Sequence, residues 1–186
     1  MSTLSETTSS ASPHDPAEPF CVERFIEQLC SQEGAKRLNA RSTLVRIGPV
    51  AVPFLLPLLH HPLRQVRWEA CKTLEQIRDP RAAHELAALL TDDDMDVRWV
   101  AADALIELEH HAVAPVLEQI EEHFDEAPLR EAAHHVLYGL HEHHVLYPEE
   151  EKVLEALKVT ELPSKAAFTA NHVLDHLRTP SPHSKQ

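Results

Sequence analysis

Residues 66–108 read VRWEACKTLEQIRDPRAAHELAALLTDDDMDVRWVAADALIEL, and they indicate a repeat architecture because they contain the same helical pattern twice. The copies VRWEACKTLEQI from Val66 and VRWVAADALIEL from Val97 are followed by a third, LREAAHHVLYGL from Leu129. All three follow (V/L)-R-x-x-A-x-x-(T/A/V)-L-x-x-(I/L), at offsets of 31 and then 32 residues. A period of this length indicates stacked supersecondary units that bury their apolar faces against one another.

The pattern extends in both directions, and each copy is followed by a second apolar run. A weaker upstream copy spans residues 37–47, and a weaker downstream copy spans residues 170–177. The second runs are AVPFLLPLL from Ala51, AAHELAALL from Ala82, VAPVLEQI from Val113 and VLEALKV from Val153. A helix of about 14 residues and a helix of about 10 residues fill such a period. The sequence therefore predicts an all-α solenoid of about four to five helical hairpins, without strands.

Residues that favour helix ends support this division. Asp79-Pro80 and Tyr147-Pro148 place proline at a first helical position, and three glutamates follow the second of these pairs. Gly48 follows the upstream copy where a helix would end, and the acidic residues 92–94 precede the copy at Val97 as N-cap candidates. We therefore expect helix boundaries at these four places.

The chain of 186 residues predicts one repeat domain between two polar tails. Residues 1–17 are rich in serine and threonine and contain no hydrophobic stretch, so we expect a disordered tail rather than a signal peptide. We expect the repeat domain over residues 18–178, with a first helix near residues 19–31, and a flexible tail over residues 179–186. Three cysteines without a CxxC motif indicate reduced thiols in a cytoplasmic protein, and Cys71 is predicted to be a buried helix residue.

The repeated stretch resembles HEAT repeats, and in particular the short variety first associated with phycobilisome lyases. The resemblance rests on D-x-x-VR-x-x-A-x-x-AL, then D-P-R-A, then L-x-x-L-L-x-D, over residues 34–109 and less closely to residue 146. It implies a right-handed superhelix in which Arg67, Arg98 and Arg130 pair with acidic residues of adjoining turns. Most such repeats bind other proteins, so the resemblance does not imply lyase activity.

The net charge of −13 is unevenly distributed along the chain, which bears on the partner. Residues 34–84 contain nine Lys/Arg and three Asp/Glu, a net of +6, whereas residues 85–162 contain four and twenty, a net of −16. A solenoid that binds nucleic acid needs a continuous basic face, and only the first third offers one. The acidic half suits a partner protein with a basic surface. We therefore expect a protein partner, no nucleic acid and no membrane insertion.

Helical geometry predicts one outward ridge across the repeats. When Ala70 faces the core, Trp68 and Lys72 point about 160° away, at 100° per residue. The equivalent positions in successive copies are Leu38, Trp68, Trp99, Glu131 and Phe168, and one turn later Ser42, Lys72, Asp103, His135 and His172. Tryptophan dominates binding hot spots, so the binding candidates are Trp68, Lys72, Trp99, Asp103, Glu131 and Phe168. The alternative is that this largely apolar column packs between the repeats.

The same ridge contains the candidate metal ligands. Glu131 and His135 are one turn apart on one copy, and His172 and His176 are one turn apart on the next. A carboxylate and three imidazoles suit zinc or non-haem iron if the two helices are adjacent. HEAT-type deoxyhypusine hydroxylases place His-Glu dyads where this sequence has Trp-Glu, Trp-Val and Glu-Ala, which argues against that activity. We therefore expect no bound metal and no cofactor.

Histidine is concentrated in the acidic half, where eight of the fifteen lie between residues 110 and 144. We interpret them as solvated residues whose carboxylate neighbours raise their pKa. The leading hypothesis for the whole chain is a non-catalytic protein-interaction scaffold or adaptor. The alternatives are an accessory or lyase-like protein that handles a bilin chromophore or its carrier, and a metal-dependent enzyme that uses the four ridge ligands.

Overall fold

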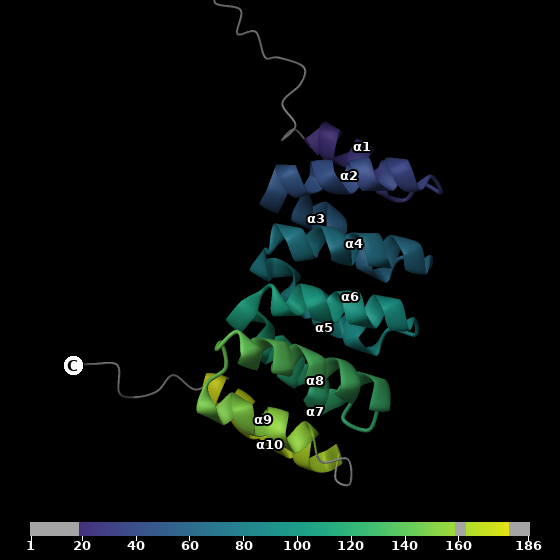
Figure 1. The fold of residues 1–186 in the computed structure, drawn as a ribbon. Helices are drawn as coiled ribbons and strands as arrows, with labels where there is room; N and C mark the ends of the chain where they lie inside the picture. The colour runs from purple at the N-terminus through teal and green to yellow at the C-terminus, as the bar shows by residue number, and fades with distance from the viewer. Residues whose placement is uncertain (1–18, 159–162, 179–186) are drawn as a thin grey trace, which may run out of the picture.

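The computed structural model describes residues 19–158 and 163–178, and within these ranges the chain is helical (Figure 1). The longer helices are α1 (Pro19–Leu29), α2 (Gly34–Ile47), α4 (Arg64–Ile77), α6 (Met95–Ile106), α7 (Val113–Glu122), α8 (Ala127–Glu142), α9 (Pro148–Leu157) and α10 (Pro163–Arg178). The shorter ones are α3 (Val52–Leu55), α5 (Ala83–Ala88) and the 3-10 helices η1 (Gly48–Ala51), η2 (Leu56–His60), η3 (Pro80–Ala82), η4 (Leu89–Thr91) and η5 (Glu109–Ala112). The expected tails, residues 1–17 and 179–186, lie outside the described residues, so that division of the chain stays a prediction.

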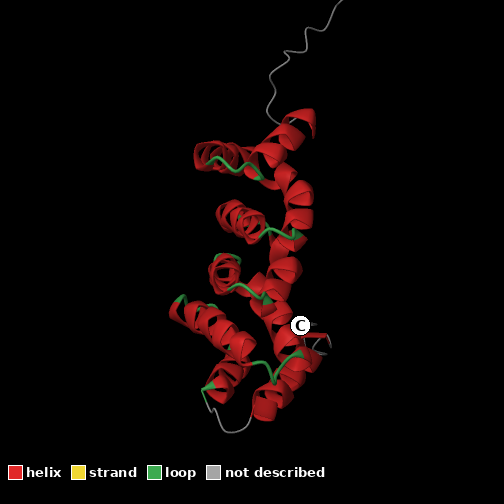
Figure 2. Ribbon diagram, turned by 90° about the vertical axis from the view of Figure 1, so that its right-hand side faces the viewer, coloured by secondary structure: helices red, strands yellow, loops and turns green. Residues whose placement is uncertain are grey.

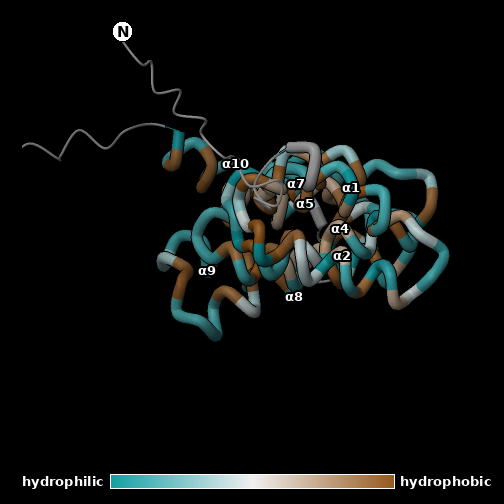
Figure 3. Tube along the Cα trace, turned by 90° about the horizontal axis from the view of Figure 1, so that it is seen from above, coloured by the Kyte–Doolittle hydropathy of each residue, from teal (hydrophilic) through white to brown (hydrophobic). Residues whose placement is uncertain are grey.

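The helices form a stack of two layers. α2, α4, α6 and α8 lie side by side in the first layer, and α1, α3, α5 and α7 lie in the second (Figures 2 and 3). Each second-layer helix packs against the first-layer helix that follows it in the chain. The described residues therefore form an α-solenoid without strands, and the predicted fold class is confirmed.

The repeated alanine and leucine of the pattern form the core of this stack. Alanines at the fifth pattern position and leucines four residues later are fully buried in every first-layer helix from α2 to α8. These residues are Ala40, Ala70, Ala101 and Ala133, and Leu44, Leu74, Leu105 and Leu137. Alanine at this position allows neighbouring helices to approach closely, and leucine fills the space one turn further on. Cys71 is also buried, as predicted, and burial raises the pKa of its thiol, so this cysteine is not an activated nucleophile.

The predicted helix boundaries are confirmed. The side chain of Asp79 accepts a hydrogen bond from the Arg81 N–H and starts η3, and Asp94 caps α6 by accepting from two N–H groups. Helix α9 begins at Pro148, as expected. Gly48 ends α2 with a φ of +74°, a conformation that other residues adopt only under strain.

The segment Gly34–His60 is apolar enough, and would be long enough as one helix, to cross a membrane. It is not one straight helix in the fold, because Gly48 ends α2 and the chain continues through η1, α3 and η2. Its buried residues Leu44, Val52 and Leu55 belong to the common core. Part of the hydrophobicity of this segment therefore belongs to the core of the stack.

The last two helices depart from the predicted order. We expected the run from Val153 to be a second-layer helix and the copy at residues 170–177 to be a first-layer helix. Instead, α9 lies beside α8, whereas α10 packs against α7 in line with α5 and α1 (Figure 3). The link after α8 turns at His144, with a φ of +57°, and returns the chain beside α8. Both helices have one apolar face, and an apolar face alone does not determine which layer a helix joins.

Candidate functional site

The structure places four of the five ridge positions on one layer. Leu38, Trp68, Trp99 and Glu131 come from α2, α4, α6 and α8 in turn. Trp68 is half-buried, whereas the side chains of Leu38, Trp99 and Glu131 are exposed, and Trp99 retains 40% of its accessible surface. Phe168 is 79% exposed but lies on α10 in the other layer, so the structure does not bring it to the ridge. We call Leu38, Trp68, Trp99 and Glu131 the ridge from here on.

Trp68 is covered by an arginine whose position is fixed. The Cζ atom of Arg41 lies 5.7 Å from the centroid of the indole ring, a cation–π contact. Arg41 Nη1 donates to Glu69 Oε2 at 2.7 Å, and Arg37 Nε donates to the other oxygen of Glu69 at 3.0 Å. Glu69 is buried on α4, so two arginines of α2 share one carboxylate of the next repeat. This ion triad holds α2 on α4 and fixes the cation above Trp68.

A slot lies beside Trp68, between the first turns of α4 and α6. It has a volume of about 320 Å³ and is lined by Arg64, Gln65, Trp68, Asp94, Asp96 and Val97. Arg64 Nη1 lies 3.4 Å from carboxylate oxygens of both Asp94 and Asp96, and its side chain is mostly exposed. These long, solvated ion pairs contribute little stability. The slot therefore offers an aromatic wall and carboxylates whose cation can be displaced.

Trp99 has a different environment from Trp68. Its ring meets the edge of the His135 ring, with the centroids 4.7 Å apart and the planes at 80°. His135 Nε2 in turn lies 3.2 Å from Asp103 Oδ1, so a ring of α8 and a carboxylate of α6 fix one side of the indole. The exposed part of the Trp99 ring faces solvent. The predicted binding residue Lys72 lies on the neighbouring α4 and pairs with Glu75 at 2.6 Å.

The arginine ladder implied by the resemblance is only partly present. Arg67 forms the expected contact, because its Nε and Nη2 donate to the two oxygens of Asp92 at 2.7 and 2.8 Å. Partial burial opposes ionisation of Asp92, but the Arg67 hydrogen bond and the Asp94 N–H outweigh it, and the pKa of Asp92 falls below its usual value. Arg98 and Arg130 differ from this expectation.

Arg98 and Arg130 bind backbone rather than acidic side chains. Arg98 donates to the Asp92 carbonyl at 2.6 Å, and Arg130 donates to the Phe124 carbonyl at 2.9 Å. In each case the acceptor lies six residues earlier, in the loop that precedes the helix. Arg67 makes the same contact with the His61 carbonyl. The shared role of the repeated arginine is thus to bind its own loop, and the pairing with an acidic residue is confined to particular repeats.

The candidate metal ligands do not converge. Glu131 and His135 lie on α8 in the first layer, whereas His172 and His176 lie on α10 in the second. The two imidazoles of α10 contact each other, with ring centroids 4.5 Å apart. Within residues 19–158 and 163–178, no three His, Cys, Asp or Glu side chains gather in a way that would hold a metal ion. The expected adjacency of the two helices was wrong because α10 joins the other layer.

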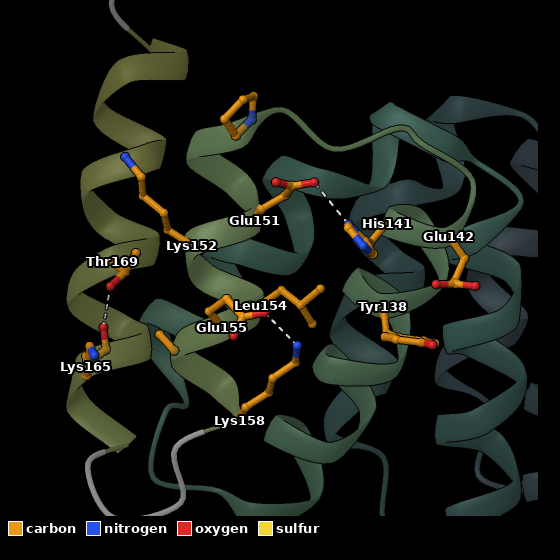
Figure 4. A pocket seen from close by; sticks show the side chains of 12 residues that line it. Tyr138, His141, Glu142, Glu151, Lys152, Leu154, Glu155, Lys158, Lys165 and Thr169 are labelled. Atoms are coloured by element: carbon orange, nitrogen blue, oxygen red, sulfur yellow. Dashed lines mark hydrogen bonds and ion pairs between the residues drawn. The ribbon is translucent and has the colours of Figure 1, made fainter.

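A second hollow, which the sequence did not predict, lies along α8, α9 and α10 (Figure 4). It has a volume of about 650 Å³, and its lining includes Tyr138, His141, Leu154, Lys158 and Thr169. These side chains come together because α9 lies beside α8, and the repeat pattern did not predict that position of α9. Most of the charges here are already paired.

Ion pairs along this hollow join neighbouring turns or helices. Lys158 pairs with Glu155 at 2.6 Å, and His141 pairs with Glu151 at 3.0 Å. The hollow therefore offers a charged ligand fewer free groups than the ridge does. His134 stacks on Tyr138 near this hollow. We expected neighbouring carboxylates to raise the pKa of the histidines in this half, but burial and nearby Lys158 lower the pKa of His134.

Comparisons with known proteins identify the family to which this chain belongs. A model of HEAT repeats matches residues 22–106 and again residues 52–138, which together cover more than half of the chain. The α-solenoid therefore belongs to the HEAT-repeat family. A search of curated proteins found no match to this chain.

Solved structures with a similar arrangement include three described as engineered proteins. Their sequence identities are 17%, 19% and 21%, with TM-scores of 0.45, 0.44 and 0.40. They align with 87%, 86% and 86% of this chain, and the alignments cover 48%, 80% and 82% of their own lengths. This chain thus spans about half the length of the first of them. At these scores the likeness carries no argument about function.

Proposed function

We propose that this HEAT-repeat chain is a non-catalytic scaffold that binds a partner protein through the outer face of α2, α4, α6 and α8. The observation that carries the proposal is the pair of tryptophans at equivalent positions of α4 and α6. Trp99 is 40% exposed although its ring is held by His135, so a large apolar side chain is presented to solvent in a fixed orientation. Rigid aromatic side chains of this kind dominate the energy of protein interfaces.

The surroundings of the two rings also suit an interface. Exposed Leu38 continues the apolar column on α2, and the slot beside Trp68 can receive a side chain of the partner. Arg64, Asp96 and Asp103 supply charged groups around the apolar centre. An apolar centre with a polar rim is the usual composition of a protein interface.

Two finer assignments concern the type of repeat and the location of the protein. We propose that the repeats are of the short, phycobilisome-lyase-like type, because Asp79 caps the turn at Asp79-Pro80 that starts η3. The residues of the ridge do not support a role in chromophore handling. We propose a cytoplasmic location because Cys30 and Cys71 are free thiols.

The experiment that tests the scaffold function is affinity capture from native lysate with three forms of the protein. The site variant is Trp99→Lys, which removes the ring and places a cation at the centre of the ridge. The control is Phe168→Lys, which makes the same change at a more exposed aromatic of the other layer. Wild type and the control should capture the same protein, and Trp99→Lys should lose it while its far-UV circular dichroism is unchanged. Capture of that protein by Trp99→Lys at the wild-type level would contradict the proposal.

A further inference from the structure

The two tryptophans of the ridge occupy equivalent positions, but only one of them has a cation over its ring. Trp68 already has a cation over its face, the Arg41 guanidinium at 5.7 Å, and Lys72 lies one turn further along α4. Trp99 has Asp103 one turn further along α6 in place of Lys72, and Asp96 nearly one turn before it. A fixed cation thus covers the face of Trp68, although Asp94 and Asp96 line the slot beside that ring. Trp99 has carboxylates within one turn on its own helix and no such cation among the described residues.

The missing cation over Trp99 has a cause in the sequence. Arg41 stands three residues after Leu38 on α2, and the residue three positions after Trp68 on α4 is Cys71. Because Cys71 is fully buried in the core, α4 does not supply Trp99 with the cation that α2 supplies to Trp68. Among the described residues, the Arg41–Trp68 pair is the only cation–π contact, so the Trp99 face lacks one.

The carboxylates around Trp99 are accessible and weakly neutralised. The Asp96 side chain is 65% exposed, and its charged partner is the solvated Arg64 at 3.4 Å. The Asp103 side chain is 49% exposed and pairs with His135, which is charged only when protonated. Glu131, at the equivalent position of α8, is exposed and forms no ion pair within the described part of the chain. An aromatic face beside exposed, weakly neutralised carboxylates is an environment that attracts a lysine or arginine side chain.

We propose that Trp99, Asp96, Asp103 and Glu131 receive a lysine or arginine from a basic segment of the partner protein. The inference rests on the proposed scaffold function and names the chemistry of its partner. The overall charge supports it, because residues 85–162 have a net charge of −16 and attract a basic chain over a long range.

The basic residues of the first repeats do not offer an equal site for an acidic partner. Arg37 and Arg41 share Glu69, Arg67 is held by Asp92 and Asp93, and Lys72 pairs with Glu75. Acidic side chains of the same repeats or of neighbouring repeats therefore already neutralise these positive charges. The acidic carboxylates near Trp99 face solvent instead, so the surface favours a basic segment over an acidic one.

The test uses a decalysine peptide as the probe and a decaglutamate peptide as its opposite. Each tryptophan is made the sole reporter in the full-length chain, Trp99 in the Trp68→Phe variant and Trp68 in the Trp99→Phe variant. Decalysine should change the fluorescence of Trp99 saturably, with little change at Trp68, and decaglutamate should change neither. The effect should weaken as salt is raised, because the contacts are solvated ion pairs.

Charge removal then locates the site. In the Trp68→Phe background, Asp96→Asn with Glu131→Gln should weaken decalysine binding about tenfold, the loss expected from two surface ion pairs. The matched control is Glu109→Gln with Glu122→Gln, which removes the same charge from exposed positions outside α6 and α8 and should change the affinity less than twofold. Thermal melts of both double variants establish that they are folded.

Three outcomes would overturn the inference. They are equal weakening by the two double variants, a decalysine response of Trp68 as large as that of Trp99, or saturable binding of decaglutamate at the ridge. If any of these occurs while Trp99→Lys still abolishes capture of the lysate partner, the scaffold function stands and only its basic partner is wrong. If the Trp99→Lys protein keeps its lysate partner while decalysine binds at Trp99 of the native ridge as expected, the basic site stands and the scaffold proposal fails.

Discussion

Replacing Ala70 with Asp should unfold most of the array, because Ala70 is a core residue of α4, a helix in the middle of the stack. Its methyl group is fully buried on α4, which packs against α2 on one side and α6 on the other. An unpaired carboxylate buried at this position costs about 3 kcal/mol or more. The added atoms cost a further 1–3 kcal/mol, roughly, because the alanine column leaves no space for them. The sum, about 4–6 kcal/mol, is a large part of the roughly 5–15 kcal/mol that stabilises a folded domain.

Urea unfolding followed by far-UV circular dichroism measures this loss. The control is Gln76→Asp, which introduces the same side chain on α4 at an exposed position. It should change the free energy of unfolding by about 0.5 kcal/mol or less. If Ala70→Asp unfolds within about 0.5 kcal/mol of wild type, Ala70 does not face the core, and the phase of the repeats that defines the ridge is wrong.

Three further predictions follow from particular contacts. Glu69→Gln should destabilise the stack by about 2–3 kcal/mol in urea unfolding, because two arginines of α2 lose their shared carboxylate; a loss under 0.5 kcal/mol would show that the triad is solvated. The lowered pKa of Asp92 means that its contact with Arg67 stabilises the fold above the ordinary aspartate pKa, and this contribution disappears as pH falls through the folded pKa. Asp92→Asn should therefore lower stability at pH 7 and flatten its decline toward pH 3, and an unchanged slope would contradict the role of the pair. Gly139→Ala should destabilise α8 despite the better helix propensity of alanine, because the new Cβ would lie 2.5 Å from Ile106 Cδ1. Adding Ile106→Val should relieve this loss of stability. A Gly139→Ala protein that is more stable than wild type would show that Ile106 moves freely.

The repeat pattern predicted the order and layer of the first eight helices because burial in a solenoid recurs with the sequence period. It did not predict that α3 and α5 would be shorter than the expected length of about 10 residues and flanked by 3-10 helices. Ala70 and Ala101 are buried at the same position of the repeat, and Asp79 and Asp94 cap the backbone next to them. The sequence period predicts the first feature and local sequence predicts the second, so neither prediction requires knowledge of distant contacts. The layer that α10 joins depends on which apolar face of the stack it packs against. That choice is set by tertiary packing, and Phe168 and His172 were consequently assigned to the wrong surface.

The candidate site was predictable in position but not in chemistry. Helical geometry placed Trp68 and Trp99 on one ridge, and the structure has them on adjacent helices of one layer. The sequence could not show that Arg41 reaches over Trp68 or that His135 meets the edge of Trp99, because these contacts join different repeats. The electrostatic difference between the two rings therefore became visible only in the packed structure.

The most direct test of the central claim is site-specific photocrosslinking in cells that express the protein. A photoreactive phenylalanine derivative replaces Trp99 in one variant and Phe168 in a second, so that one probe lies on the ridge and the other on α10. The probe at position 99 should form a covalent adduct with a discrete partner protein whose crosslinked peptide is rich in lysine or arginine. The probe at position 168 should not capture this partner. Capture of the partner from position 168 and not from position 99 would contradict the claim that the ridge is the binding surface.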